Sequence, residues 1–155
     1  MSVRVARLAP FGSPSDGLQA TVVVPARNEE ASLPALVAAL EDVRRPGSWG
    51  RDALEVLVLL NNCTDGSERV ARELATSRTW LRVAHVDLPA EHAHVGRARQ
   101  ILFDTAAARL LEVGRPDGLI LSTDADSRPA RDWLAETVLE VEAGADAVFG
   151  RIGLV

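Results

Sequence analysis

The sequence contains two short runs, Thr21–Val24 and Glu55–Leu60, that are apolar or β-branched at nearly every position. A strand with one face in water alternates apolar and polar side chains, because successive residues point to opposite faces of a sheet. Runs without this alternation predict strands that are covered on both faces. Such strands are typical of a parallel sheet.

Segments with helical spacing of their apolar residues alternate with the strand-like runs. Helices are predicted over 32–43, 68–75, 96–113 and 131–142, and further strands over 81–86, 119–124 and 146–149. The repeated order of strand and helix, joined by short loops, predicts a Rossmann-like α/β fold with an open, mostly parallel sheet and helices on both faces. Residues 1–19, which are rich in Pro and Gly, are expected to form an irregular lead-in to a single domain over 20–155.

Polar clusters follow the predicted strands. In sheets of this kind ligands bind beyond the carboxyl ends of the strands, and these ends lie at one edge of the sheet. We therefore expect the clusters to converge there; they cover residues 27–29, 61–65, 92–99 and 124–126.

The last of these clusters contains an acidic pair, Asp124 and Asp126, directly after the apolar run Leu119–Leu121. If the strand continued through them, both side chains would point the same way. Two such carboxylates repel each other unless a cation lies between them, and their oxygens suit Mg²⁺ or Mn²⁺ with open positions for phosphates. In the alternative interpretation, the acids only stabilise a turn or the start of the next helix.

The charge of the chain restricts how it could bind phosphates. The formal net charge is −5, which argues against nucleic acid as the main partner. All 17 basic residues are Arg, so a P-loop lysine and a Schiff-base lysine are excluded. No Gly-x-Gly-x-x-Gly follows the first strand, so phosphates would need the metal, assisted by Arg97 or Arg99 near a helix N-terminus.

The cellular location is inferred from what the sequence lacks. Cys63 is the single cysteine, so no internal disulfide can form. No segment has the length and apolar character of a membrane span, and the N-terminus lacks the core of a signal peptide. A cytoplasmic location is expected, and membrane association is left open.

Four segments in order resemble the nucleotide-binding half of family 2 glycosyltransferases, which have the GT-A fold. They are residues 22–30, 61–67, 96–99 and 123–126, the last being an Asp-x-Asp motif. The resemblance implies a nucleotide-diphosphate sugar as donor and an acceptor that is unknown. It also implies that the family's acceptor half and catalytic base would lie beyond Val155, so no catalytic residue is assigned.

The resemblance also implies roles for individual residues. Those that would line the nucleotide site are Pro25, Arg27, Asn28, Glu29, Asn62, Asp65, Arg97, Arg99 and Asp124, while Asp124 and Asp126 would hold Mg²⁺ or Mn²⁺. The family often has an acidic residue where Asn61 or Asn62 stands, which leaves the base, uracil or guanine, open.

Structural alternatives exist for several of these residues. Glu29 could be a first-turn acid favoured by the helix dipole, and Asp65 could be a helix cap. Arg97 and Arg99 could be solvated helix residues, and a phosphate contact is expected for one of them.

Three functions remain open from the sequence. The first is an inverting, metal-dependent glycosyltransferase, and the second is a module that binds nucleotide-sugar without turnover. The third is a haloacid-dehalogenase-like phosphohydrolase, suggested by Asp124 to Ser127 after a strand. It ranks last because that chemistry needs a downstream Lys, which the chain lacks.

Overall fold

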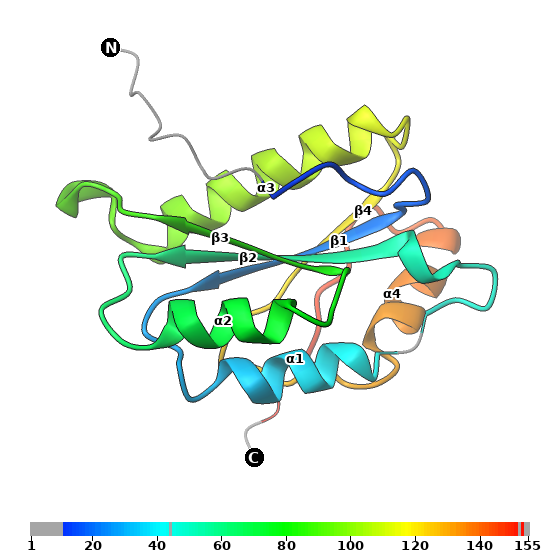
Figure 1. Ribbon diagram of the computed structural model, residues 1–155. Helices are drawn as coiled ribbons and strands as arrows, with labels where there is room; N and C mark the ends of the chain where they lie inside the picture. Colours follow the sequence, from blue (N-terminus) through cyan, green and yellow to red (C-terminus); the bar gives the residue numbers. More distant parts are fainter. Residues whose placement is uncertain (1–10, 44, 152, 154–155) are drawn as a thin grey trace, which may run out of the picture.

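The computed structural model describes residues 11–43, 45–151 and 153, and the first ten residues of the predicted lead-in lie outside that part. Within it, four parallel strands form one sheet in the order β3-β2-β1-β4 (Figure 1). The strands are β1 Ala20–Ala26, β2 Leu54–Asn61, β3 Leu81–Val86 and β4 Leu119–Ser122. The prediction of a parallel sheet is confirmed.

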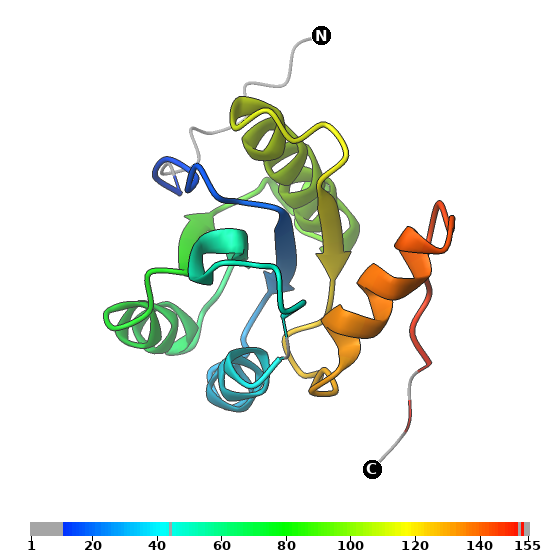
Figure 2. The same ribbon diagram turned by 90° about the vertical axis from the view of Figure 1, so that its right-hand side faces the viewer.

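Helices cover both faces of this sheet (Figure 2). The helices are α1 Leu33–Glu41, α2 Ser67–Ala75, α3 Val95–Glu112 and α4 Trp133–Glu142, and two single 3₁₀ turns lie at 51–53 and 90–92. α1, α2 and α4 contribute buried residues to the larger apolar core. α3 packs on the opposite face, where Leu102 and Ala106 contact the central strands. This is the predicted Rossmann-like α/β architecture.

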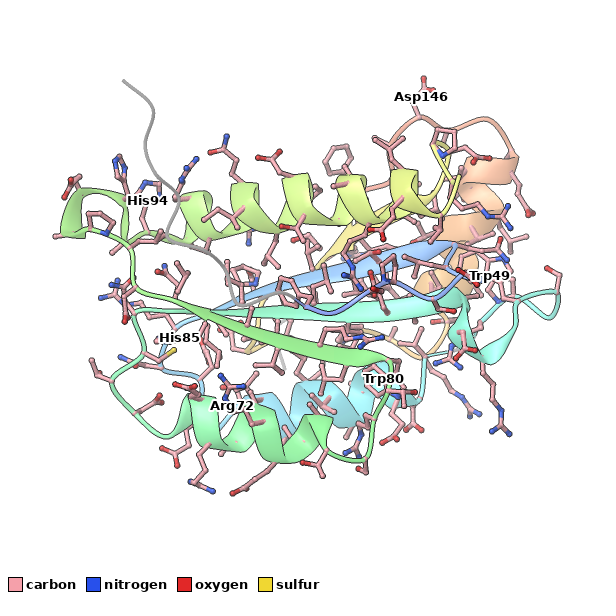
Figure 3. The ribbon with its side chains drawn as sticks, turned by 45° about the horizontal axis from the view of Figure 1, so that its top comes forward. Trp49, Arg72, Trp80, His85, His94 and Asp146 are labelled. Carbon is pink, nitrogen blue, oxygen red and sulfur yellow. The ribbon has the colours of Figure 1, made fainter. Side chains whose placement is uncertain are left out.

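Both central strands are covered along their whole length. Every residue of β1 and β2 is buried, as the absence of alternation in the sequence predicts. The edge strand β3 is only partly buried. Trp49 and Trp80 (Figure 3), together with Trp133, are partly buried against the larger core. They act as packing residues, as expected from their scattered positions.

β1 continues through Pro25, at which the sequence predicted its end. Val23 accepts a backbone hydrogen bond from Thr123 on the β4 side. Pro25 lies two residues further along, so its missing N–H group would face the same side. β4 has ended there, since its last paired residue is Ser122, opposite Val23. The proline is tolerated because this side of β1 has no neighbouring strand to bond.

Two further predictions are wrong. The predicted strand at 146–149 does not form, and Phe149 is 92% exposed. No neighbouring strand pairs with this segment in the described part of the chain, and an isolated extended segment does not bury its apolar side chains. The strand before the acidic pair ends at Ser122, so Asp124 and Asp126 lie in a turn closed by a bond from the Ser127 N–H to the Asp124 carbonyl. Strand alternation therefore does not orient the pair.

A buried ion pair joins strand β2 to helix α3. Arg109 of α3 donates two hydrogen bonds to the carboxylate of Glu55, at 2.7 and 2.6 Å. A third N–H group of Arg109 bonds the Gly12 carbonyl, so the same side chain also fixes the segment before β1. Phe11 and Leu18 in that segment are buried although its backbone is irregular.

Candidate functional site

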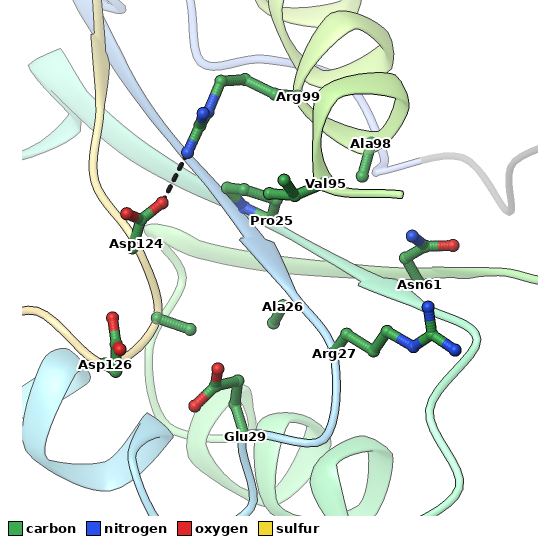
Figure 4. Close-up of a pocket in the computed structure, with 11 residues that line it drawn as sticks. Pro25, Ala26, Arg27, Glu29, Asn61, Val95, Ala98, Arg99, Asp124 and Asp126 are labelled. Carbon is green, nitrogen blue, oxygen red and sulfur yellow. Dashed lines mark hydrogen bonds and ion pairs between the residues drawn. The ribbon is translucent and has the colours of Figure 1, made fainter. Parts of the chain in front are cut away.

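A cavity of about 360 Å³ opens at the carboxyl-terminal edge of the sheet (Figure 4). It lies beyond the ends of the neighbouring strands β1 and β4. From β1 the chain adds β2 and β3 on one side of the sheet and then adds β4 on the other side, so the strand order reverses between β1 and β4. Ligands of open α/β sheets bind at such points. The volume falls within the usual range for small-molecule sites.

The end of β1 forms one wall of the cavity. Pro25, Arg27 and Glu29 all line it, as the sequence predicted. Arg27 also donates a hydrogen bond of 2.8 Å to the carbonyl of Ala93, in the loop before α3. The guanidinium therefore ties this loop to the mouth of the cavity.

The loops after β1 and β2 are joined by side-chain hydrogen bonds. Asn28 adopts a left-handed backbone, with φ of 56°, and its side-chain oxygen accepts the Thr64 N–H at 2.7 Å. Asp65 accepts from Ser67 and from the backbone N–H of Glu30. The hydroxyl of Ser67 is the main reason why the pKa of the Asp65 carboxyl is lowered from its ordinary value. Neither Asn28 nor Asp65 lines the cavity, and the hydrogen bonds of both side chains join the two loops instead.

The two asparagines after β2 have different positions. Asn61 is 2% exposed and lines the cavity. Its side-chain oxygen has no hydrogen-bond partner among the residues that the structure describes. Asn62, with φ of 49°, turns away and exchanges two hydrogen bonds with the backbone of Leu88. Asn61, and not Asn62, therefore lies in the cavity wall.

The start of α3 forms the opposite wall. Val95, Ala98 and Arg99 line the cavity, whereas Arg97 lies outside the lining and bonds Gln100 at 2.8 Å. The imidazole of His94 caps this helix by accepting the Arg97 N–H. Of the two arginines considered for a phosphate contact, the fold therefore places Arg99 in the cavity.

The acidic pair completes the rim. Asp124 and Asp126 both line the cavity, and Arg99 bonds a carboxylate oxygen of Asp124 at 2.5 Å (Figure 4). Among the described residues no group of three or more His, Cys, Asp or Glu side chains could enclose a metal ion. Two carboxylates at an open rim nevertheless fit Mg²⁺ or Mn²⁺ in nucleotide sites, where phosphates and water complete the coordination.

Sequence reasoning missed several residues of the lining. The additional residues are Ala26, Asn61, Val95, Ala98 and Ala125. The apolar run in the sequence ends at Leu60, so Asn61 directly follows it, and this position could have favoured Asn61 over Asn62 as the residue on the strand. The small apolar residues carry no chemical signal and could be found only from the fold.

The family of the chain follows from a comparison with known protein families. Residues 21–155 match the family described as Glycosyl transferase family 2. The chain belongs to this family. The match covers the four strands, apart from Ala20 at the start of β1, and every residue that lines the cavity.

Solved structures of GT-A glycosyltransferases share the fold. S. aureus TarS (residues 1–349) in complex with UDP is 19% identical with a TM-score of 0.60, and the similarity covers 81% of this chain and 32% of that one. The TarS fragment in complex with UDP-GlcNAc gives the same values. The mannosyltransferase PcManGT from Pyrobaculum calidifontis, in complex with GDP-Man and Mn²⁺, is 25% identical with a TM-score of 0.51 over 81% of this chain and 33% of its own.

The family member described here therefore spans about one third of the length of these solved relatives. A search of curated proteins found no match. No helix in the described part of the chain combines the length and apolar character that crossing a bilayer requires.

Proposed function

We propose that the cavity binds the nucleotide-diphosphate sugar of a metal-dependent glycosyltransferase reaction, with Asp124 and Asp126 holding Mg²⁺ or Mn²⁺. The transfer to an acceptor, with inversion at the sugar carbon, is part of the same proposal. The observation that carries it is the meeting of an acidic pair, an arginine and a buried amide in one cavity of a family 2 chain. No catalytic base is assigned among these residues.

The charges of the lining support a need for a cation. Glu29, Asp124 and Asp126 supply three carboxylates, against the guanidinium groups of Arg27 and Arg99. A diphosphate would enter a site with an excess of negative charge, which is unfavourable without neutralisation. A divalent cation at the acidic pair supplies that neutralisation when it is bound, and it stabilises charge on the leaving diphosphate. Arg99 is the chain's own donor for the same phosphates.

Asn61 is proposed to contact the base. Its amide lies in the cavity wall with an unpartnered oxygen, and an unpaired buried polar group is costly until a ligand meets it. Rotation of the amide exchanges its donor and acceptor. An ionised Asp at this position could only accept a hydrogen bond, so Asn61 is compatible with more than one base. Of the solved relatives, TarS is described in complex with UDP and PcManGT in complex with GDP-Man.

Isothermal calorimetry with UDP, GDP and their sugars, with and without Mn²⁺, tests the donor site. We expect binding that requires the metal and falls at least about tenfold in Asp126→Asn, since half of the protein's carboxylate ligands are lost. The matched control is Asp117→Asn, which changes an exposed acid just before β4, at the amino-terminal end of the strand and away from the cavity. This variant should bind as the wild type does. Equal affinity in EDTA would contradict the metal assignment.

A donor-hydrolysis assay on the same protein separates an enzyme from a binding module. Release of free sugar would support catalytic competence in this chain, and tight binding without release would favour the module. Family membership favours both over the phosphohydrolase considered from the sequence. An aspartyl-phosphate trapped at Asp124 would reverse that ranking.

A further inference from the structure

The contact between Arg99 and Asp124 places a protein cation on one member of the proposed metal pair. Arg99 lies near the start of α3 and Asp124 in the turn after β4, and their side chains are 38% and 58% exposed. In the described part of the chain Asp126 makes no ion pair. Of the acidic pair, Asp124 is thus paired with a guanidinium, and Asp126 makes no ion pair with a described residue.

The guanidinium of Arg99 is incompletely bonded in this position. One terminal nitrogen bonds Asp124, while the buried Nε has no hydrogen-bond partner among the described residues. A guanidinium carries five N–H donors, so Arg99 can bond a second anion in bidentate fashion once it turns away from Asp124. The pairing is also half exposed, and ion pairs of this kind are weak enough to exchange partners.

Arg99 bonds Oδ1 of Asp124, which is one of the two oxygens that this carboxylate could offer to a divalent cation. Two positive groups on one carboxylate repel each other, so the contact with Arg99 weakens metal binding when no phosphate ligand is present. A diphosphate changes this balance, because it offers Arg99 a new anionic partner within the same cavity.

We propose that Arg99 is a displaceable counter-ion that couples metal binding to nucleotide binding. Without donor it neutralises Asp124 and weakens the affinity for metal. When metal and diphosphate enter together, the guanidinium leaves Asp124 and bonds the diphosphate. Each ligand then increases the affinity for the other, as reciprocal coupling between two sites requires. This inference depends on the proposed donor site and adds an order of events to it.

Mn²⁺ titrations followed by electron paramagnetic resonance, first without nucleotide, test the competition directly. We expect Arg99→Gln to bind Mn²⁺ about two- to fivefold more tightly than the wild type, the range that an exposed ion pair is worth. Arg97→Gln removes the same charge from the same helix turn but lies outside the cavity, so its Mn²⁺ affinity should be unchanged.

The same proteins are then titrated with UDP and GDP at saturating Mn²⁺. Arg99→Gln should bind the preferred nucleotide more weakly, and the factor by which nucleotide increases Mn²⁺ affinity should shrink. Arg99→Lys keeps the positive charge but lacks the planar guanidinium, so its Mn²⁺ and nucleotide affinities should lie between those of the wild type and Arg99→Gln. If Arg99→Gln does not fold, Arg99→Lys replaces it in both titrations.

The two proposals fail in distinguishable ways. If the wild type binds no nucleotide in Mn²⁺, the donor site itself is wrong. If the wild type binds nucleotide with Mn²⁺ but Arg99→Gln gains no Mn²⁺ affinity over the wild type, the counter-ion role is overturned. In that case the contact is a fixed tie between α3 and the β4 turn, and its loss should lower the melting temperature without altering the metal–nucleotide coupling.

Discussion

Replacing Arg109 by Met tests how the fold holds α3, the helix that carries Arg99. The Arg109 and Glu55 side chains are 8% and 6% exposed, so water cannot solvate the carboxylate when its partner is removed. Among the described residues, Thr21 would remain as the only side chain that donates a hydrogen bond to this carboxylate, at 3.3 Å. Breaking a buried pair from one side costs about 3–5 kcal/mol. That is a large part of the roughly 5–15 kcal/mol that stabilises a domain.

Urea unfolding followed by circular dichroism measures this loss. With a denaturant slope of about 2 kcal/mol per molar, the midpoint of Arg109→Met should fall by about 1.5–2.5 M. The double variant Arg109→Met/Glu55→Leu should recover at least about 2 kcal/mol relative to the sum of the single changes, because no unpaired charge remains buried.

The matched control is Arg72→Met, which removes the exposed ion pair of Arg72 with Glu68. Those side chains are 56% and 43% exposed at a separation of 2.8 Å, so the loss should stay below about 1 kcal/mol. The reasoning is refuted if Arg109→Met loses no more than Arg72→Met, or if the effects of the two single changes at Arg109 and Glu55 simply add.

Three further changes test the loops around the cavity. Asp65→Asn should lower the melting temperature at neutral pH, because the pKa of Asp65 is lowered in the folded state and its contribution is fully present above the unfolded pKa. The difference from wild type should begin to shrink as the pH falls below about 4 and should vanish only below the lowered folded-state pKa. Asn62→Ala should cost about 1–2 kcal/mol in urea unfolding, since it removes two bonds to Leu88 and a residue suited to positive φ, and the Leu88 amide should exchange hydrogen faster. Pro25→Ala should change the free energy of unfolding by less than about 1 kcal/mol in the same assay, because no strand carbonyl faces the restored N–H.

Most of the fold could be predicted from local patterns. The boundaries of β3 match the predicted ones at 81–86, and the predicted ends of the other strands and helices are within three residues of those observed. The prediction failed at 146–149, where the apolar pattern of a strand is present but its hydrogen-bonding partner is not. An apolar pattern shows which side chains a strand could bury, but the strand forms only if a neighbouring strand is present to bond it.

The candidate site could be predicted as a region but not residue by residue. Pro25, Arg27, Glu29, Arg99, Asp124 and Asp126 line the cavity, while Asn28, Asn62, Asp65 and Arg97 lie outside its lining. The residues outside are polar like those inside, and Asn28, Asn62 and Arg97 are adjacent to lining residues, so no property of their side chains distinguishes them. Asn28, Asn62 and Asp65 are held by hydrogen bonds to neighbouring loops, and Arg97 bonds Gln100 of its own helix.

The sequence by itself determined a parallel sheet and the edge at which its polar loops meet, because burial on both faces excludes alternation and parallel strands all end on the same side. The tertiary structure decided that Asn61 and Arg99, and not Asn62 and Arg97, face the cavity. One step along a strand reverses the face of a side chain, and two steps along a helix turn it by about 200°. Such choices depend on which loops pack together at the rim, and that information lies in contacts between segments far apart in the chain.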